Sequence, residues 1–180
     1  MHLLKRDLWA ETTRVRLDGG EWVLKRSRLV PWLARHERAI YARLAGIAGV
    51  PRLHPARGRN WFLHEFIPGR SLGRRRAPAA FYDDLERVLR AVHARGVAYV
   101  DLSKRSNVIA GDDGRAYLVD FQIAVVGVRW LMREDLYHLA KLRGAPRRRS
   151  RVNALHKWAL RAPYLRIRRL FFEHGAGEAA

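Results

Sequence analysis

The sequence contains five side chains of the types that phosphate chemistry uses. Asp101 and Asp120 supply carboxylate oxygens and Asn107 supplies an amide oxygen, a set that suits a hard cation such as Mg²⁺. Mg²⁺ binds through few protein oxygens and fills its remaining positions with phosphate oxygens. Upstream, Lys25 and Glu37 offer an ion pair. A fixed lysine, two metal-binding oxygens and a separate aspartate that orients a hydroxyl group are the parts that phosphoryl transfer requires.

A predicted β-hairpin brings the three oxygen-bearing residues together. Two short apolar runs, 108–110 and 116–119, flank a Gly-Asp-Asp-Gly turn, which is typical of a hairpin. If the first residue of the first run pairs with the last residue of the second, Asn107 and Asp120 face each other at the open end, roughly 5 Å apart between Cα atoms. Asp101 enters the same region from the preceding loop.

The upstream pair is positioned by a predicted sheet and helix. Residues 14–17 and 21–25 alternate in polarity around an Asp-Gly-Gly turn, which predicts antiparallel strands. A proline and a glycine bracket a predicted helix over 31–45. Glu37 falls on the apolar face of this helix, at helical spacing with Leu33, Ile40 and Leu44. A carboxylate on an apolar face needs a partner, and Lys25 is the candidate.

The elements that follow complete an α+β pattern. Residues 61–67 read as a strand that ends at a Pro-Gly turn, and residues 78–95 read as a second helix. The apolar face of this helix consists of Phe81, Leu85, Val88, Leu89 and Val92. We therefore expect a small antiparallel sheet with one helix, followed by a mostly helical part.

In these positions the chain resembles protein kinases. Val23-Leu24-Lys25 resembles their third-strand lysine motif, Glu37 the glutamate of the next helix, residues 101–107 the catalytic loop and Asp120-Phe121-Gln122 the Asp-Phe-Gly motif. The resemblance covers about residues 3–145. More narrowly, the chain is similar to small bacterial kinase-like proteins grouped with lipopolysaccharide core kinases and atypical RIO-type serine/threonine kinases.

The resemblance implies an ATP-dependent and Mg²⁺-dependent kinase. Asp101 is then the catalytic base, Lys104 lies beside it in the catalytic loop, and Asn107 and Asp120 hold Mg²⁺. The acceptor is a hydroxyl group of a protein Ser/Thr or of a lipopolysaccharide core sugar.

The same resemblance assigns four residues to the binding of ATP. Lys25, fixed by Glu37, is expected to contact the phosphates. Glu65 and Ile67 belong to the segment that corresponds to the hinge, against which the adenine stacks.

The implied architecture is a single two-lobed, protein-kinase-like domain over 1–180. Its N-lobe is 1–67, its reduced and mostly helical C-lobe core is 68–145, and 146–180 is a basic helical segment. The run from Glu134 to Leu139 corresponds to the start of the central C-lobe helix.

Three departures from the kinase pattern stand out. Asn107 follows Asp101 by six residues instead of five. Tyr99-Val100 replaces the usual His-Arg before the aspartate, and Gln122 replaces the glycine after Asp-Phe. Residues 1–18 contain no glycine, so a glycine-rich loop over the phosphates is not available there. Phosphate positioning is then expected to depend more on Lys25 and the metal.

Composition narrows the class of protein. The chain has 180 residues, 36 Lys+Arg against 17 Asp+Glu, a net charge of +19 and 48% hydrophobic residues, which is too apolar for a disordered basic tail. The absence of cysteine excludes disulfides, thiolate metal sites and a thiol nucleophile. Only five of the basic residues are lysines, so each lysine merits separate attention. The charged N-terminal residues and the lack of a long apolar run predict a soluble, cytoplasmic protein.

The C-terminal segment predicts a separate binding property. Residues 136–172 contain eleven Lys/Arg and no Asp or Glu, with apolar residues interleaved. Such a segment is typical either of a solvated helical face or of a basic amphipathic element on an anionic surface. The second interpretation places the protein at the inner face of the cytoplasmic membrane. Nucleic acid fits the charge, but the sequence has no recognisable nucleic-acid-binding module.

Alternative functions remain open at this level. The chain could be a nucleotide-binding pseudokinase, or a basic membrane-binding or RNA-binding module without catalysis. Residues 69–73 also match the G-x-S-x-G pattern of hydrolases, but three arginines follow where the helix of a nucleophile elbow should begin.

Overall fold

The computed structural model describes residues 2–6, 10–28, 30–73 and 76–145. They belong to one compact unit, Met1–Ala145. The predicted basic helical segment, 146–180, lies outside the described residues. In the described part of the chain, no helix combines the length and the apolar character needed to cross a membrane.

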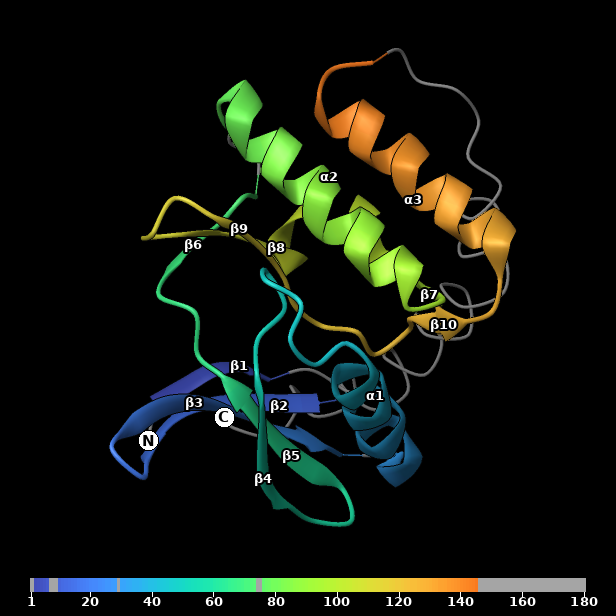
Figure 1. The fold of residues 1–180 in the computed structure, drawn as a ribbon. Helices are drawn as coiled ribbons and strands as arrows, with labels where there is room; N and C mark the ends of the chain where they lie inside the picture. Colours follow the sequence, from blue (N-terminus) through green and yellow to red (C-terminus); the bar gives the residue numbers. More distant parts are fainter. Residues whose placement is uncertain (1, 7–9, 29, 74–75, 146–180) are drawn as a thin grey trace, which may run out of the picture. The chain divides into compact units, whose positions relative to one another are not determined.

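The described residues form a mixed α+β fold, as the sequence predicted (Figure 1). The helices are α1 (Pro31–Arg43), α2 (Ala79–Ala94) and α3 (Arg129–Leu142), with two 3₁₀ turns, η1 (Asp101–Ser103) and η2 (Arg105–Asn107). The strands are β1 (His2–Arg6), β2 (Ala10–Leu17), β3 (Gly20–Ser27), β4 (Leu53–Arg57), β5 (Trp61–Glu65), β6 (Gly69–Ser71), β7 (Val97–Ala98), β8 (Val108–Gly111), β9 (Ala116–Leu118) and β10 (Val125–Val126).

The largest sheet has five antiparallel strands in the order β1-β2-β3-β5-β4. β2 and β3 form the predicted hairpin, whose turn residues Asp18 and Gly19 have φ angles of 50° and 73°. Both residue types tolerate this left-handed conformation. Helix α1 packs against β3 and β5, so this sheet has a buried face under the helix.

Helix α1 confirms the predicted orientation of its apolar face. Pro31 occupies its first position, where the missing N–H is not needed. Glu37 and Ile40 are buried, and Leu44 is buried just after the helix, whereas Leu33 is only half-buried. The periodicity of the sequence therefore located the buried carboxylate correctly.

The second half of the described chain combines two helices with two small sheets. Strands β6, β8 and β9 form one sheet, and β7 pairs with β10 in the other. Helices α2 and α3 pack side by side (Figure 1), and α2 also packs on β9. The predicted apolar face of α2, made of Phe81, Leu85, Val88, Leu89 and Val92, is buried throughout.

The predicted register of the β8–β9 hairpin is wrong by one residue. Val108 pairs with Leu118, and the Val119 N–H donates to the Asn107 carbonyl at 3.0 Å, so Asn107 faces Val119. The cause lies in the loop: Gly114 adopts a φ of 80°, which gives a three-residue loop ending in a left-handed residue. Asp120 therefore lies one residue beyond the hairpin mouth, with a φ of 64°.

One hydrophobic cluster connects these elements. It includes residues of α1, α2, β5, β8 and β9 and the Phe121 side chain, which is fully buried. Burial of a side chain of this size stabilises a fold by about 1.5–3 kcal/mol. The chain segments that carry the polar residues are thus attached to a common core.

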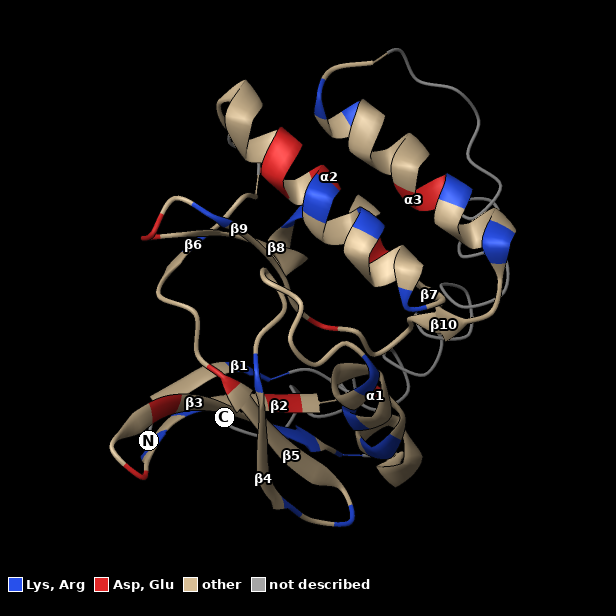
Figure 2. Cartoon of the chain, viewed as in Figure 1, with Lys and Arg blue, Asp and Glu red and all other residues tan. Residues whose placement is uncertain are grey.

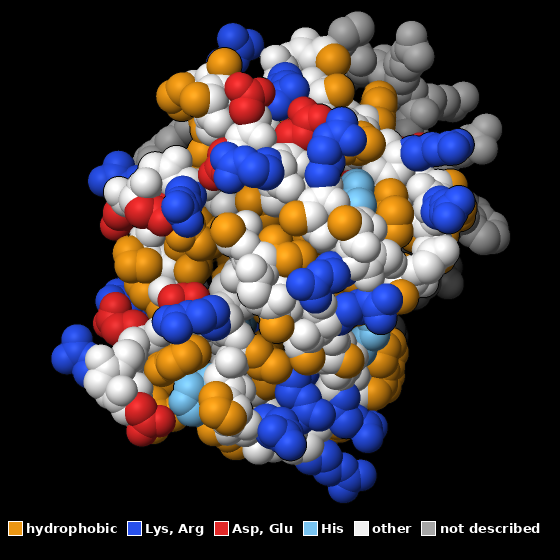
Figure 3. Space-filling view, viewed as in Figure 1, with side chains coloured by type: hydrophobic (Ala, Val, Ile, Leu, Met, Phe, Trp, Pro, Cys, Tyr) orange, Lys and Arg blue, Asp and Glu red, His pale blue; other side chains and the backbone are white. Residues whose placement is uncertain are grey.

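Charged side chains are distributed widely over the described residues. Lys and Arg occur on all three helices, and the acidic residues of α2 lie among them (Figure 2). On the face seen in Figure 3, basic side chains are scattered, with acidic and apolar ones between them. On this face, the basic side chains thus form no single continuous patch.

Candidate active site

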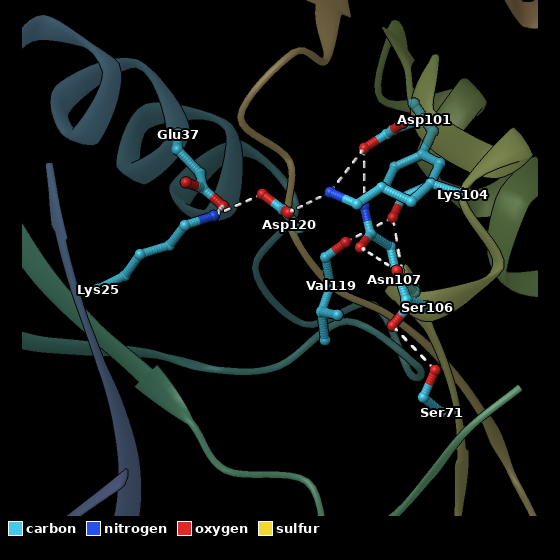
Figure 4. Close-up of polar contacts among 10 residues, drawn as sticks. Lys25, Glu37, Ser71, Asp101, Lys104, Ser106, Asn107, Val119 and Asp120 are labelled. Carbon is cyan, nitrogen blue, oxygen red and sulfur yellow. Dashed lines mark hydrogen bonds and ion pairs between the residues drawn. The ribbon is translucent and has the colours of Figure 1, made fainter. Parts of the chain in front are cut away.

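Lys25 lies between two carboxylates that come from different parts of the chain (Figure 4). Its Nζ atom donates to Glu37 Oε1 at 2.7 Å and to Asp120 Oδ1 at 2.5 Å. Lys25 is on β3, Glu37 is on α1, and Asp120 follows β9. The Lys25 and Glu37 side chains are almost completely buried. The predicted ion pair is therefore present, and it has a third member.

Burial and mutual attraction shift the pKa values of all three groups. Burial alone lowers the pKa of Lys25, but attraction by Glu37 and then Asp120 outweighs it and raises this pKa well above its usual range. Burial also opposes ionisation of Asp120, yet Lys25 holds the pKa of that carboxyl well below its usual range. Burial raises the pKa of Glu37 to about 7, against the opposing effect of Lys25. The lysine and Asp120 are thus charged at neutral pH.

The second cluster joins Asp101, Lys104 and Asn107. Asn107 Nδ2 donates to Asp101 Oδ2 at 2.7 Å, and Lys104 Nζ lies 3.8 Å from the same oxygen. Lys104 Nζ also lies 3.5 Å from Asp120 Oδ2, which connects the two clusters (Figure 4). The structure therefore brings together both predicted catalytic residues and both predicted metal ligands.

Two successive 3₁₀ turns account for the unusual spacing of Asp101 and Asn107. The Lys104 N–H donates to the Asp101 carbonyl at 3.0 Å, and the Asn107 N–H donates to the Lys104 carbonyl at 2.9 Å. Because a 3₁₀ turn has three residues, side chains three positions apart lie on the same side. The six-residue spacing thus places these side chains within hydrogen-bond distance.

The ionisation of Asp101 is also perturbed. Burial raises the pKa of its carboxyl to about 6, although Lys104 and the hydrogen bond from Asn107 act in the opposite direction. A carboxylate with a raised pKa is a better proton acceptor than an ordinary exposed aspartate.

Asp135 of α3 anchors the backbone that leads into Asp101. Its carboxylate is fully buried and accepts hydrogen bonds from the N–H groups of Tyr99 and Val100, both at 2.7 Å. It also contacts His93 Nε2 at 3.0 Å. Val100 has a φ of 70°, which is a strained conformation for a β-branched residue. We infer that Asp135 holds this strained turn in place.

Aromatic packing fixes the segment around Asp120. The buried Phe121 ring makes edge-to-face contacts with Tyr41 at 5.1 Å and with Tyr99 at 5.0 Å between ring centroids. The Tyr99 hydroxyl donates to the Val119 carbonyl at 2.5 Å. One tyrosine comes from α1 and the other precedes Asp101, so Phe121 connects both to the Asp120 segment.

A cleft of about 330 Å³ adjoins these groups. It is lined by Leu4, Lys5, Ala10, Thr12, Val23, Lys25, His64, Glu65, Phe66, Ile67, Lys104, Ser106, Asn107, Ile109, Val119, Asp120 and Gln122. Six of the eight predicted site residues are among them, and the remaining two, Glu37 and Asp101, are in direct contact with Lys25 and Asn107. A second hollow of about 390 Å³, lined by residues such as Leu24 and Trp61, contains no predicted site residue.

The predicted hinge residues Glu65 and Ile67 line the cleft, although the Glu65 side chain also has another partner. The Glu65 carboxylate binds Arg52, with the closest contact at 3.0 Å. Between Glu65 and Ile67 lies Phe66, whose ring is covered by the Arg14 guanidinium at 4.0 Å from the ring centroid. Apolar residues, among them Val23, Phe66 and Ile67, thus line the cleft together with the charged ones.

The sequence did not predict three residues of the candidate site. Two of them, His64 and Lys5, line the cleft, and the third, Asp135, binds the backbone of the two residues that precede Asp101. His64 is buried, stacks on Tyr41 at 5.1 Å between ring centroids and donates from Nδ1 to the Glu65 carbonyl. Burial lowers the pKa of His64 to about 4, so its ring is neutral. The scarcity of lysine was the only sequence signal for Lys5.

The side-chain oxygen atoms of Asn107 and Asp120 are of a type that binds a hard cation. Asn107 uses its amide nitrogen to bind Asp101, which leaves its amide oxygen with a single weak contact at 3.4 Å to Ser106 Oγ. This oxygen and the Asp120 carboxylate are the ligand types that Mg²⁺ prefers. Among the described residues, no group of three or more His, Asp and Glu is arranged to hold a metal by itself. Two protein oxygens plus phosphate oxygens fit this arrangement.

Comparison with models of known protein families finds no match, and a search of curated proteins finds no sequence similar enough to count as a relative.

Proposed function

We propose that this protein is an ATP-dependent and Mg²⁺-dependent phosphotransferase with a two-lobed, protein-kinase-like fold. The observation that carries the proposal is the bridge formed by Lys25 between Glu37 and Asp120, which lies beside the pair of Asp101 and Asn107. These residues follow each other in the order of the kinase pattern that the sequence resembles. They come from four separate segments of the chain, so their spacing in the sequence does not by itself bring them together.

The proposed roles follow from the positions of the side chains. Lys25 binds phosphate oxygens of ATP, and Glu37 keeps its ammonium group in place. Asn107 and Asp120 hold Mg²⁺, which neutralises charge on the phosphates when it is bound. The acceptor oxygen forms a bond to the γ-phosphorus while its proton passes to the Asp101 carboxylate. The bond from the γ-phosphorus to the bridging oxygen breaks, and ADP leaves.

The departures from the kinase pattern are compatible with this proposal. The extra residue between Asp101 and Asn107 is accommodated by the two 3₁₀ turns, which keep these side chains 2.7 Å apart. Tyr99 stands where the pattern has histidine, and it still binds the segment before Asp120 through the Val119 carbonyl.

The hydrolase interpretation receives less support. Residues Gly69–Ser71 form strand β6, and the Ser71 hydroxyl donates to the Ser106 carbonyl at 3.2 Å. A nucleophile elbow requires a sharp turn from a strand into a helix, whereas α2 begins only at Ala79. Ser71 thus has a structural role in this fold.

The test is incubation of the full chain with labelled ATP and Mg²⁺, with lipopolysaccharide and a generic basic protein as alternative acceptors. We expect label in one acceptor and a loss of about 10²–10⁴-fold in rate for Asp101→Asn, since a general base contributes this much. ATP-dependent thermal stabilisation should persist in this variant. The matched control is Asp112→Asn, which changes an exposed aspartate of the hairpin loop and should leave the rate unchanged.

The other outcomes separate the remaining hypotheses. ATP-dependent stabilisation without label in either acceptor would favour a nucleotide-binding pseudokinase. Neither stabilisation nor label would contradict the proposal and favour a basic binding module. Equal rates for Asp101→Asn and the unaltered protein would remove Asp101 as the base.

A further inference from the structure

Lysine is concentrated at the cleft. The chain has only five lysines among 36 basic residues, so arginine supplies most of its positive charge. Three of the five, Lys5, Lys25 and Lys104, line the same cleft. The proposed function uses Lys25 and Lys104, but it gives no role to Lys5.

The sheet register places Lys5 on the same face as Lys25. Lys5 pairs with Thr12 across β1 and β2, and Thr12 pairs with Lys25 across β2 and β3. Directly opposed residues of an antiparallel sheet project from the same face. Since neighbouring strands are about 4.8 Å apart, the two lysines start roughly 10 Å from each other, with Thr12 between them. All three residues line the cleft.

Lys5 lines the same cleft as the predicted metal ligand Asp120. The Nζ atom of Lys104, another residue of this cleft, lies 3.5 Å from Asp120 Oδ2. Of the two cleft lysines on the sheet, Lys5 is exposed to solvent, whereas Lys25 is buried. A chain of several phosphates that enters the cleft toward Asp120 therefore passes between an outer and an inner ammonium group.

The absence of glycine in the N-terminal residues gives a lysine at position 5 a particular importance for phosphate binding. Residues 1–18 contain no glycine, so the backbone N–H cradle of a glycine-rich loop has no counterpart there. A lysine side chain supplies positive charge and three N–H donors to phosphate oxygens without requiring a special backbone conformation.

We propose that Lys5 binds the phosphate chain of the nucleotide from strand β1, in place of a glycine-rich loop. The inference rests on the proposed function, because it takes a nucleotide with several phosphates as the ligand of the cleft. It adds a second phosphate-binding lysine on the same face of the sheet as Lys25, two strands away.

The experiment compares Lys5→Met with Arg6→Met in the full chain by calorimetric titration with ATP and with adenosine. Arg6 is the adjacent basic residue of β1, it lies 3.5 Å from Glu11, and it does not line the cleft. Both variants lose one positive charge from the same strand. We expect Lys5→Met to weaken ATP binding about tenfold or more, because a hydrogen bond to a charged group is lost. Adenosine binding should stay unchanged, Arg6→Met should bind both ligands normally, and Lys5→Arg should retain most of the ATP affinity.

The outcomes distinguish this inference from the proposed function. If Lys5→Met and Arg6→Met bind ATP equally well and the unaltered protein transfers phosphate, Lys5 is not a phosphate ligand, while the proposed function stands. If Lys5→Met loses ATP and adenosine affinity to the same extent, its role is structural and the inference is overturned. If the unaltered protein binds no ATP, the proposed function fails and this inference fails with it.

Discussion

The Nζ atom of Lys25 lies 2.5 Å from Oδ1 of Asp120, although 95 residues separate them in the sequence. This contact joins the five-stranded sheet to the segment after β9. Because Lys25 also binds Glu37, one ammonium group is shared by two carboxylates. Lys104 Nζ lies 3.5 Å from the other Asp120 oxygen, Oδ2, so the Asp120 carboxylate has an ammonium group near each of its oxygens.

Replacing Lys25 with methionine should weaken both stability and function. The change leaves Glu37 and Asp120 without their buried counter-charge, and breaking a buried ion pair in this way costs about 3–5 kcal/mol. We expect the free energy of unfolding in urea at pH 8 to fall by up to this amount, and ATP-dependent stabilisation to be lost.

A double variant separates the two effects. Lys25→Met combined with Glu37→Leu removes the buried carboxylate as well, so the free energy of unfolding should recover by at least about 1 kcal/mol. ATP binding should not recover. If the double variant were less stable than Lys25→Met, Glu37 would not depend on Lys25 for its charge compensation.

Replacing Asp120 with asparagine should remove the metal dependence of nucleotide binding. The variant keeps the shape of the side chain but loses the carboxylate that is proposed to hold Mg²⁺ together with Asn107. Titration of ATP with Mg²⁺ and with EDTA should give affinities that differ in the unaltered protein and agree in the variant. A metal dependence that survives in Asp120→Asn would assign Mg²⁺ to other ligands.

Replacing Asp135 with alanine should destabilise the loop before Asp101. The change leaves the N–H groups of the buried Tyr99 and the half-buried Val100 without their acceptor, and each such loss costs up to about 1–3 kcal/mol. Urea unfolding should detect the destabilisation, and the rate of the proposed phosphotransfer should fall because the strained turn at Val100 relaxes.

Asp135→Asn is the matched variant for this prediction. Its amide keeps one oxygen acceptor for one of the two N–H groups, so its stability should lie between those of the alanine variant and the unaltered protein. Phosphotransfer at the normal rate in Asp135→Ala would show that the turn does not need this support.

Local features of this structure and the pairing of Lys25 with Glu37 were predictable from the sequence, whereas other long-range contacts were not. Helical spacing placed Glu37 on a buried face, because burial in a helix repeats with the helical period. The β2–β3 hairpin followed from its Asp-Gly-Gly turn. In contrast, no local pattern indicates that Asp135 binds the backbone of Tyr99 and Val100. The sequence identified this residue only as part of a helix.

The number of residues in the β8–β9 loop changes the position of Asp120 in the candidate site. A Gly-Asp-Asp-Gly segment can close a hairpin with three or four loop residues, and the left-handed conformation of Gly114 selects three. The shift moves Asp120 out of register with Asn107. Its own φ of 64° then allows the carboxylate to reach Lys25. The next residue, Phe121, packs on Tyr41 and Tyr99, both of which lie outside the hairpin, so the sequence of the hairpin alone does not predict this arrangement.

Acid should destabilise the protein partly through His64. Burial lowers the pKa of this side chain to about 4 in the folded protein, whereas the pKa of an exposed histidine is about 6.5. Between these pH values the unfolded chain binds a proton that the folded protein does not bind. Stability therefore falls as the pH decreases from about 6.5 to about 4, by up to about 3 kcal/mol from this residue.

The measurement is the free energy of unfolding in urea at several pH values for the unaltered protein and for His64→Phe. Phenylalanine keeps a planar ring for the contact with Tyr41 but cannot take up a proton, so the stability of the variant should decrease less steeply between pH 6.5 and pH 4. Carboxylates contribute to the slope in both proteins, and the difference between the two curves isolates His64. The control is His2→Phe, which removes an exposed histidine and should leave the slope unchanged. Parallel curves for His64→Phe and the unaltered protein would mean that His64 binds its proton equally well in the folded and unfolded states, in conflict with its burial against Tyr41 and Phe62.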